Sequence, residues 1–329
     1  MTNHERTRTA LAILALVWCA AGASCPRAGN PWSIEPTQRA LPPAPTLDQV
    51  IEVVHRNNSR IQSFSATRAV LSGSGFPTLQ ANVAFERPRK LRLVAKSGVS
   101  AGPELDIGSN SDLFWFWLRR GEPPAVYFCR HDQFAESPAR HAVPIEPDWL
   151  IEALGIVEFD PALPHQGPIP VGADRFEIRT IRETENGPVT KTTTIDAVHG
   201  WVVEQRLHDE QGRLVASAVA TRHRRDPLTG LTMPEVVQIN FPPAQLAMQL
   251  DLGAVQINRL PPGAEGLWTM PQYHGSPTID LGDPNVRLVP LPGGSASAGR
   301  MPGIAAGNSA SAPPRSWSPR IARFGESLP

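Results

Sequence analysis

The chain has 329 residues, with 31 Lys and Arg and 31 Asp and Glu, so its formal net charge is zero. This balance argues against nucleic acid as a partner, because binding to phosphate backbones needs a surplus of cations. The 35 prolines are about twice the usual share. Because proline breaks helix interiors, they argue against helical bundles, coiled coils and helical solenoids, and an antiparallel β architecture with proline-marked loops fits better.

The N-terminus has the pattern of an export signal. Arg6 and Arg8 precede an uncharged apolar run over residues 10–23. This run is shorter than the roughly 20 residues that span a bilayer, and it has the length of a signal-peptide core. A buried first helix is the alternative, but a proline-rich stretch follows the run instead of a second element. We therefore predict a signal peptide over residues 1–24 and no span in the mature chain.

A cysteine stands at the predicted cleavage site. Residues 22–25, Gly-Ala-Ser-Cys, resemble a bacterial lipobox, in which small residues precede a cysteine that becomes acylated. The sequence departs from that pattern at Gly22, where such motifs usually carry Leu or another aliphatic residue. Lipidation of Cys25 would anchor the protein to a membrane of the bacterial envelope, facing the periplasm. Ordinary cleavage after Ala23 remains the alternative.

Composition divides the rest of the chain into three parts. Residues 25–45 are rich in Pro and Ala and suit a tether between the lipid anchor and a folded body. Residues 46–283 have the length of one all-β domain. Residues 284–329 consist mostly of Pro, Gly, Ser and Ala, which cannot bury enough apolar surface to offset their ordering entropy, and we expect them to be disordered.

Two helices are predicted within the domain. The first begins after Thr46, a plausible N-cap, and its apolar residues recur at helical spacing to about Ser63. The second begins at Pro147, has an apolar side that includes Trp149 and Leu154, and ends near Gly155.

Elsewhere the apolar period is two, which is typical of strands joined by hairpins. About ten to eleven consecutive strands are expected. The run 113–118 (LFWFWL) is unusual because it is apolar on both faces. The predicted strands lie within 79–85, 91–96, 105–107, 113–118, 125–129, 176–180, 190–195, 201–207, 214–220, 236–241 and 246–252.

The order of these elements resembles that of a known superfamily. The residues that carry the resemblance are the strand-linking stretch 86–92 (ERPRKLR), the pattern Asp196-x-x-x-Gly200, the pattern His208-Asp209-x-x-Gly212, and Gly230-Leu231-x-x-Pro234. Over roughly residues 46–258 the chain resembles the outer-membrane lipoprotein carrier and receptor superfamily, the LolA/LolB-like proteins. The resemblance implies a mainly β fold, an incomplete antiparallel β-barrel capped by two or more helices around an apolar cavity. It also implies binding of acyl chains and movement or receipt of lipoproteins between envelope membranes, and a lipid anchor resembles the receptor branch.

Such a cavity would be lined by large apolar side chains, although ordinary core packing is the alternative for each of them. If Trp115 and Trp117 line a groove, the alternating Phe114 and Phe116 do not. The cavity candidates are Phe85, Leu93, Trp115, Trp117, Tyr127, Trp201, Met248 and Leu250.

The sequence carries no motif of an enzyme that we recognise. It contains no H-E-x-x-H or C-x-x-C metal pattern, no G-x-S-x-G nucleophile elbow and no phosphate-binding loop. We therefore expect no catalysis, no cofactor and no metal, and interpret Cys129 as a small buried hydrophobe. A structural or interaction lipoprotein without bound lipid is the second hypothesis. The basic stretch 222–225 (RHRR) could contact lipid head groups or be a solvated turn, and the sequence identifies no protein partner.

Overall fold

The computed structural model describes residues 39–73, 76–121, 124–137, 147–184, 187–288 and 304–305. The predicted signal peptide 1–24, Cys25 and most of the predicted tail 284–329 lie outside these residues. Among the helices of the described residues, none combines the length and the apolar character needed to cross a membrane.

The first helix, α2 (Leu47–Asn58), begins where the sequence predicts. The hydroxyl of Thr46 accepts a hydrogen bond from the backbone N–H of Gln49, whose side chain accepts one from the backbone N–H of Thr46. This reciprocal capping box satisfies two donors that the helix start leaves unpaired. The helix ends earlier than predicted, because Ser63 already begins the first strand.

The second helix, α3 (Pro147–Ala153), also confirms the prediction. Proline suits its first position because the missing N–H has no partner there in any helix. The chain leaves the helix at Gly155, whose φ of 101° is a conformation that favours glycine.

The strands form one large sheet that does not close, and a short pair, β16 (Arg287–Leu288) with β17 (Ile304–Ala305), forms a second sheet. The first half of the large sheet holds β1 (Ser63–Gly73), β2 (Phe76–Glu86), β3 (Lys90–Lys96), β4 (Pro103–Ser109), β5 (Leu113–Leu118), β6 (Val126–Arg130) and β15 (Thr278–Asp280). The second half holds β7 (His165–Pro170), β8 (Arg175–Thr184), β9 (Gly187–Asp196), β10 (Val202–His208), β11 (Leu214–Arg225), β12 (Thr232–Phe241) and β13 (Leu246–Asp251), and β14 (Gln256–Ile257) pairs with β1.

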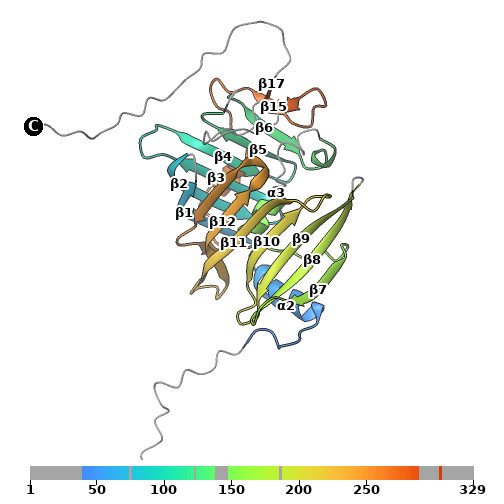
Figure 1. Cartoon of the computed structure of the whole chain (residues 1–329). Helices are drawn as coiled ribbons and strands as arrows, with labels where there is room; N and C mark the ends of the chain where they lie inside the picture. The colour runs from blue at the N-terminus through green and yellow to red at the C-terminus, as the bar shows by residue number, and fades with distance from the viewer. Residues whose placement is uncertain are drawn as a thin grey trace, which may run out of the picture.

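Each half is a meander, and β1 joins the two by pairing antiparallel with β13 (Figure 1). The predicted mainly β, incomplete barrel with helices is confirmed. One detail of the prediction was wrong. The 15 strands of the large sheet exceed the ten to eleven expected, because β14 and β15 are too short to show a period, β7 contains two prolines, and a bulge between Ala66 and Ala69 interrupts the alternation of β1. The chain leaves the meander between β6 and β7, and α3 lies in that connection, as predicted.

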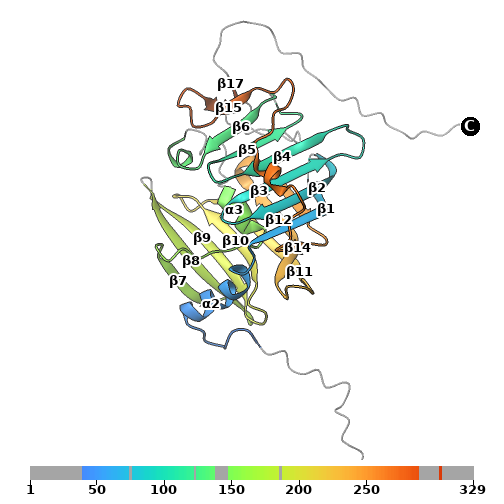
Figure 2. The same cartoon turned by 180° about the vertical axis from the view of Figure 1, so that it is seen from behind.

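The sheet curves so that α3 lies between its two halves, as both views show (Figures 1 and 2). Leu154, directly after α3, packs in one apolar cluster with Phe85 and Leu93 of the first half. Trp149 packs in another with Val237 of the second half, and α2 covers neighbouring strands of that half. We call the face toward the helices the inner face and the opposite one the outer face.

A C-terminal segment, residues 258–281, crosses the outer face of the first half. It includes the 3-10 helix η4 (Ala264–Trp268), which lies in front of β3 in Figure 2. The segment ends in β15, which pairs parallel with β6 at the edge of the sheet. The first half therefore has α3 against part of its inner face and this segment across its outer face.

Candidate functional site

Half-exposed apolar side chains gather on the inner face. On β4 and β5, Leu105 lies opposite Leu118 and Ile107 lies opposite Phe116. The ring of Phe116 stacks on that of Tyr127, with centroids 5.0 Å apart. Because alternate residues share a face, all of these side chains lie on the face that carries Leu93. The set that we call the inner apolar face is Leu105, Ile107, Phe116, Leu118, Leu150 and Met248.

The structure divides the eight predicted cavity residues among three places. The inner face carries five of them: Phe85, Leu93 and Leu250 are buried, Met248 packs half-buried beside them, and Tyr127 lies on β6. The other three lie on the outer face or at its end, so the eight do not line one cavity. Those three are Trp115, Trp117 and Trp201.

Trp115 and Trp117 point outward because they alternate with Phe114 and Phe116 along β5. The alternation itself was predicted; in the structure the phenylalanines face inward. The ring of Trp117 stacks on Tyr273 of the C-terminal segment, with centroids 3.9 Å apart, and its Nε1 donates to Ser276 Oγ at 3.0 Å. These tryptophans therefore fasten the segment to the sheet.

A buried ion pair lies beside the two tryptophans. Asp106 is fully buried, and its Oδ2 accepts hydrogen bonds from Arg92 Nη2 at 2.7 Å and from the Tyr273 hydroxyl. Arg92 also donates to the carbonyl oxygens of Leu267 and Thr269. Burial, and then the hydrogen bond to Asp106, raise the pKa of Tyr273 above its ordinary value. The phenol thus remains a neutral donor to the carboxylate.

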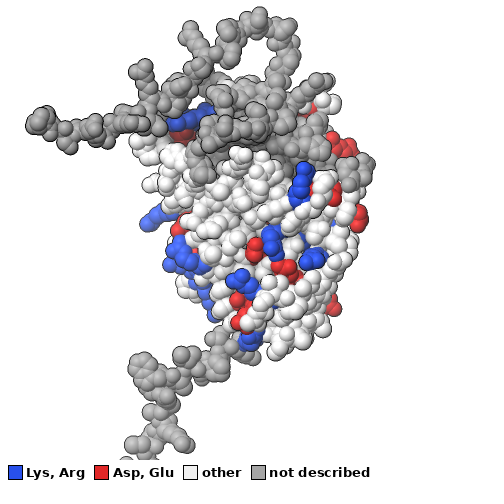
Figure 3. Space-filling model, viewed as in Figure 1, with Lys and Arg blue, Asp and Glu red and all other residues white. Residues whose placement is uncertain are grey.

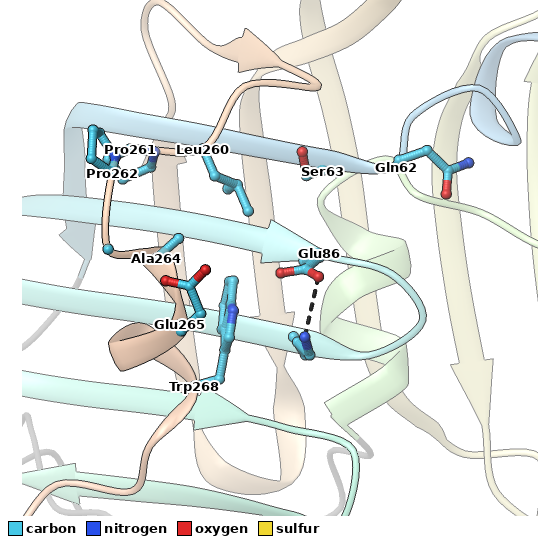
Figure 4. A pocket seen from close by; sticks show the side chains of 11 residues that line it. Gln62, Ser63, Glu86, Leu260, Pro261, Pro262, Ala264, Glu265 and Trp268 are labelled. Atoms are coloured by element: carbon cyan, nitrogen blue, oxygen red, sulfur yellow. Dashed lines mark hydrogen bonds and ion pairs between the residues drawn. The ribbon is translucent and has the colours of Figure 1, made fainter.

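A pocket of about 510 Å³ opens between the C-terminal segment and strands β1 to β3 on the outer face (Figure 4). Lys90 Nζ lies 3.1 Å from Glu86 Oε1 and 5.9 Å from the centroid of the Trp268 ring. Leu260 and Glu265 line the same pocket. Its wall mixes both charge signs with apolar groups, unlike the inner apolar face.

Trp201 occupies a different position, at one end of the second half. Its ring is stacked between the rings of His199 and His223, with centroid distances of 4.2 and 4.5 Å. Asp196 Oδ1 lies 2.9 Å from His199 Nδ1. Burial lowers the pKa of His223.

Cys129 is buried and free, as the sequence suggests. Burial, and then the charges of Asp280 and Asp132, raise the pKa of its thiol to about 11. A thiol with so little thiolate at neutral pH is a poor nucleophile. Over the described parts of the chain, no group of three or more His, Cys, Asp or Glu side chains is placed so that it could hold a metal ion.

The residues that sequence reasoning missed are those that hold the C-terminal segment. Asp106 alternates with Leu105 and Ile107 in a predicted strand, which marked it as facing away from them, but no pattern indicated that a later segment would bury it. Tyr273 and Ser276 lie in a stretch without apolar periodicity. Such a stretch contacts residues far away in the sequence, and these contacts leave no pattern in the local sequence that could predict them.

No family model matches the chain, and no curated protein does. Solved structures do. A putative outer membrane lipoprotein-sorting protein domain from Vibrio parahaemolyticus is 12% identical, with a TM-score of 0.47, and the match covers 67% of this chain and 98% of that one. A LolA superfamily protein from Nitrosomonas europaea is 11% identical, with a TM-score of 0.45, over 69% and 98%. A DUF1329 family protein from Desulfovibrio piger is 12% identical, with a TM-score of 0.44, over 66% and 95%.

Proposed function

We propose that this protein is an exported, non-enzymatic lipoprotein of the bacterial envelope that holds acyl chains on its inner apolar face. Cys25 would carry the lipid anchor, and the folded domain would bind the acyl chains of lipids or of other lipoproteins during their trafficking. The observation that supports this most directly is the row of half-exposed apolar side chains beside α3, on the face that a soluble domain ordinarily fills completely.

The physical basis of the binding would be hydrophobic. Each methylene group that leaves water for an apolar surface contributes about 0.8 kcal/mol. Lengthening an acyl chain by two carbons should therefore tighten binding about 15-fold for as long as the added carbons still fit on the face. Leu150 of α3 packs against the apolar clusters of both halves of the sheet. A shift of this helix would therefore widen the face on both sides.

A second candidate is a structural or interaction lipoprotein without bound lipid. It is supported by the packing of α3, because Trp149 and Leu154 are buried between the two halves and already fill part of the concavity. If this second candidate is correct, the inner apolar face is only the partly exposed edge of a core that protein side chains already fill.

Binding of a fluorescent fatty acid to the chain from residue 26 onward separates the two. Phe116→Glu places a charge on the inner apolar face and should weaken binding at least tenfold. Val70→Glu is the matched control, because Val70 is an exposed hydrophobe on β1, whose neighbours Ala69 and Leu71 are the ones that face inward, and it should leave binding unchanged. Both variants are first checked for an unchanged unfolding midpoint in urea. No binding by the unaltered chain, or equal binding by both variants, would favour the structural lipoprotein.

The anchor is tested separately in bacteria that express the full chain. Mass spectrometry of the N-terminal peptide should find an acylated cysteine at Cys25, and Cys25→Ser should release the protein from the membrane fraction. An unmodified N-terminus that follows Ala23 would instead show ordinary cleavage.

A further inference from the structure

One end of the second half of the sheet collects several turns. The chain turns there between β7 and β8, between β9 and β10, and between β11 and β12. Trp201, in the turn that precedes β10, and His223, near the end of β11, stack on each other. We call this region the Trp201 end and define it by His199, Trp201, His223, Arg224, Arg225 and Leu228.

The Trp201 end carries two exposed basic residues. Arg224 and Arg225 are neighbours in sequence, and neither pairs with a carboxylate among the described residues. Two of the nearby acids are already paired: Asp251 binds Arg222 at 2.7 Å, and Asp226 lies 3.5 Å from Arg259. A third, Glu235, lines the same pocket as Arg224 and Arg225. Figure 3 shows the outer face of the second half, where basic side chains gather at the left edge and both signs mix elsewhere.

Apolar and aromatic groups lie beside these arginines. Leu228 stands at the tip of the turn after β11 with 73% of its surface exposed, and few large apolar residues of the described ranges are so exposed. Trp201 is partly exposed at the same end of the sheet. Tryptophan is enriched at membrane–water interfaces, where its ring is apolar and its N–H stays wet.

The N-terminal tether enters the fold at the same end. The backbone N–H groups of Ala40 and Leu41 donate to the carbonyl oxygens of Val198 and Ala197, in the turn that precedes Trp201. Arg39 Nη1 pairs with Asp174 in the turn after β7. The 14 peptide links between Cys25 and Arg39 extend at most about 50 Å. If Cys25 were held at a membrane surface, the tether would therefore keep the Trp201 end, more than the opposite end of the sheet, near that surface.

We propose that the Trp201 end docks on a bilayer that contains anionic phospholipid. Arg224 and Arg225 would contact the head groups, Leu228 would enter the interfacial layer, and Trp201 would lie at its boundary. The proposal requires neither a lipid on Cys25 nor acyl binding on the inner apolar face, and it is tested on the chain from residue 26 onward, which has no anchor.

The first experiment measures co-sedimentation with vesicles of phosphatidylcholine alone or with added phosphatidylglycerol. The chain should bind the anionic vesicles and release them at high salt. Arg224→Gln with Arg225→Gln should weaken binding about 25-fold, from about fivefold per arginine near the surface. Arg119→Gln with Arg120→Gln is the matched control, because these adjacent exposed arginines lie at the opposite end of the strands, and it should bind as the unaltered chain does.

The second experiment reports where the bilayer touches. The chain from residue 26 has a single cysteine, the buried Cys129, so an environment-sensitive fluorophore can be placed on Leu228→Cys or on Val99→Cys. Val99 is 98% exposed in the turn between β3 and β4, at the opposite end. The label at residue 228 alone should shift to the blue on anionic vesicles. No binding, binding that is indifferent to phosphatidylglycerol, or a shift at residue 99 instead would overturn the proposal. Binding that fails on vesicles but appears with an acidic protein would assign the surface to that partner class and overturn it too.

Discussion

Replacing Gly108 by alanine tests the packing of the outer face of the first half. A Cβ at Gly108 would lie 2.1, 2.3 and 2.8 Å from three carbons of the Trp115 indole, where ordinary contact begins near 3.4 Å. The ring would have to move by more than 1 Å. It is 1% exposed and lies 5.2 Å from the Arg92 guanidinium above it, so it has little room.

The expected cost can be worked from these contacts. Overpacking a closed site costs about 1–3 kcal/mol, and disturbing the cation–π contact adds roughly 0.5–1 kcal/mol. Lower entropy of the unfolded chain returns about 0.4–1 kcal/mol, because the backbone at Gly108 has no positive φ that would strain alanine. Gly108→Ala should therefore lower the free energy of unfolding by about 1–3 kcal/mol.

Urea unfolding followed by near-ultraviolet circular dichroism measures this change. Gly98→Ala is the control, because a Cβ there meets nothing within 4 Å, and it should be neutral or slightly stabilising. In a chain that already carries Trp115→Phe, whose smaller ring leaves space, Gly108→Ala should cost much less. An unchanged midpoint in Gly108→Ala, or an equal loss with and without Trp115→Phe, would refute the placement of the indole against β4.

Three further changes follow from contacts described above. Asp106→Ala should lower the free energy of unfolding by about 3–5 kcal/mol, because it leaves the buried Arg92 without its partner, and urea unfolding would show it. The pKa of the Tyr273 phenol is raised in the native state, so the native protein keeps this phenol protonated at a pH where the unfolded chain ionises it. Its contribution to stability is therefore full below about pH 10 and is lost as the pH rises through the native pKa. Tyr273→Phe should lessen this alkaline loss of stability when the free energy of unfolding is measured against pH. Cys129 should react with a thiol reagent only after denaturant exposes it, and rapid reaction of the native protein would contradict its burial.

The elements were largely predictable from sequence because their signals are local. The capping box at Thr46 and the period-two strands depend on neighbours within a few residues. The face of β5 could not be read, because LFWFWL is apolar on both sides and period alone does not say which side meets the helices. The outward position of Trp115 depends on residues about 150 positions later, such as Met270 and Tyr273. Of the candidate cavity residues, those on the inner face accordingly lie together, and the tryptophans do not join them.

The pairing of β1 with β13 has a consequence for how the protein folds. Within the meanders β1–β6 and β7–β13, every other pairing joins strands that are neighbours in sequence, so each meander can form from local contacts, whereas Val70 meets Asp251 only after a long loop closes. Such non-local pairings are slow to form. Until this seam closes, β1 and β13 are open edges that can pair with other chains. We therefore expect the seam to limit the folding rate, and fragments that end before β13 to aggregate even though their own meander is complete.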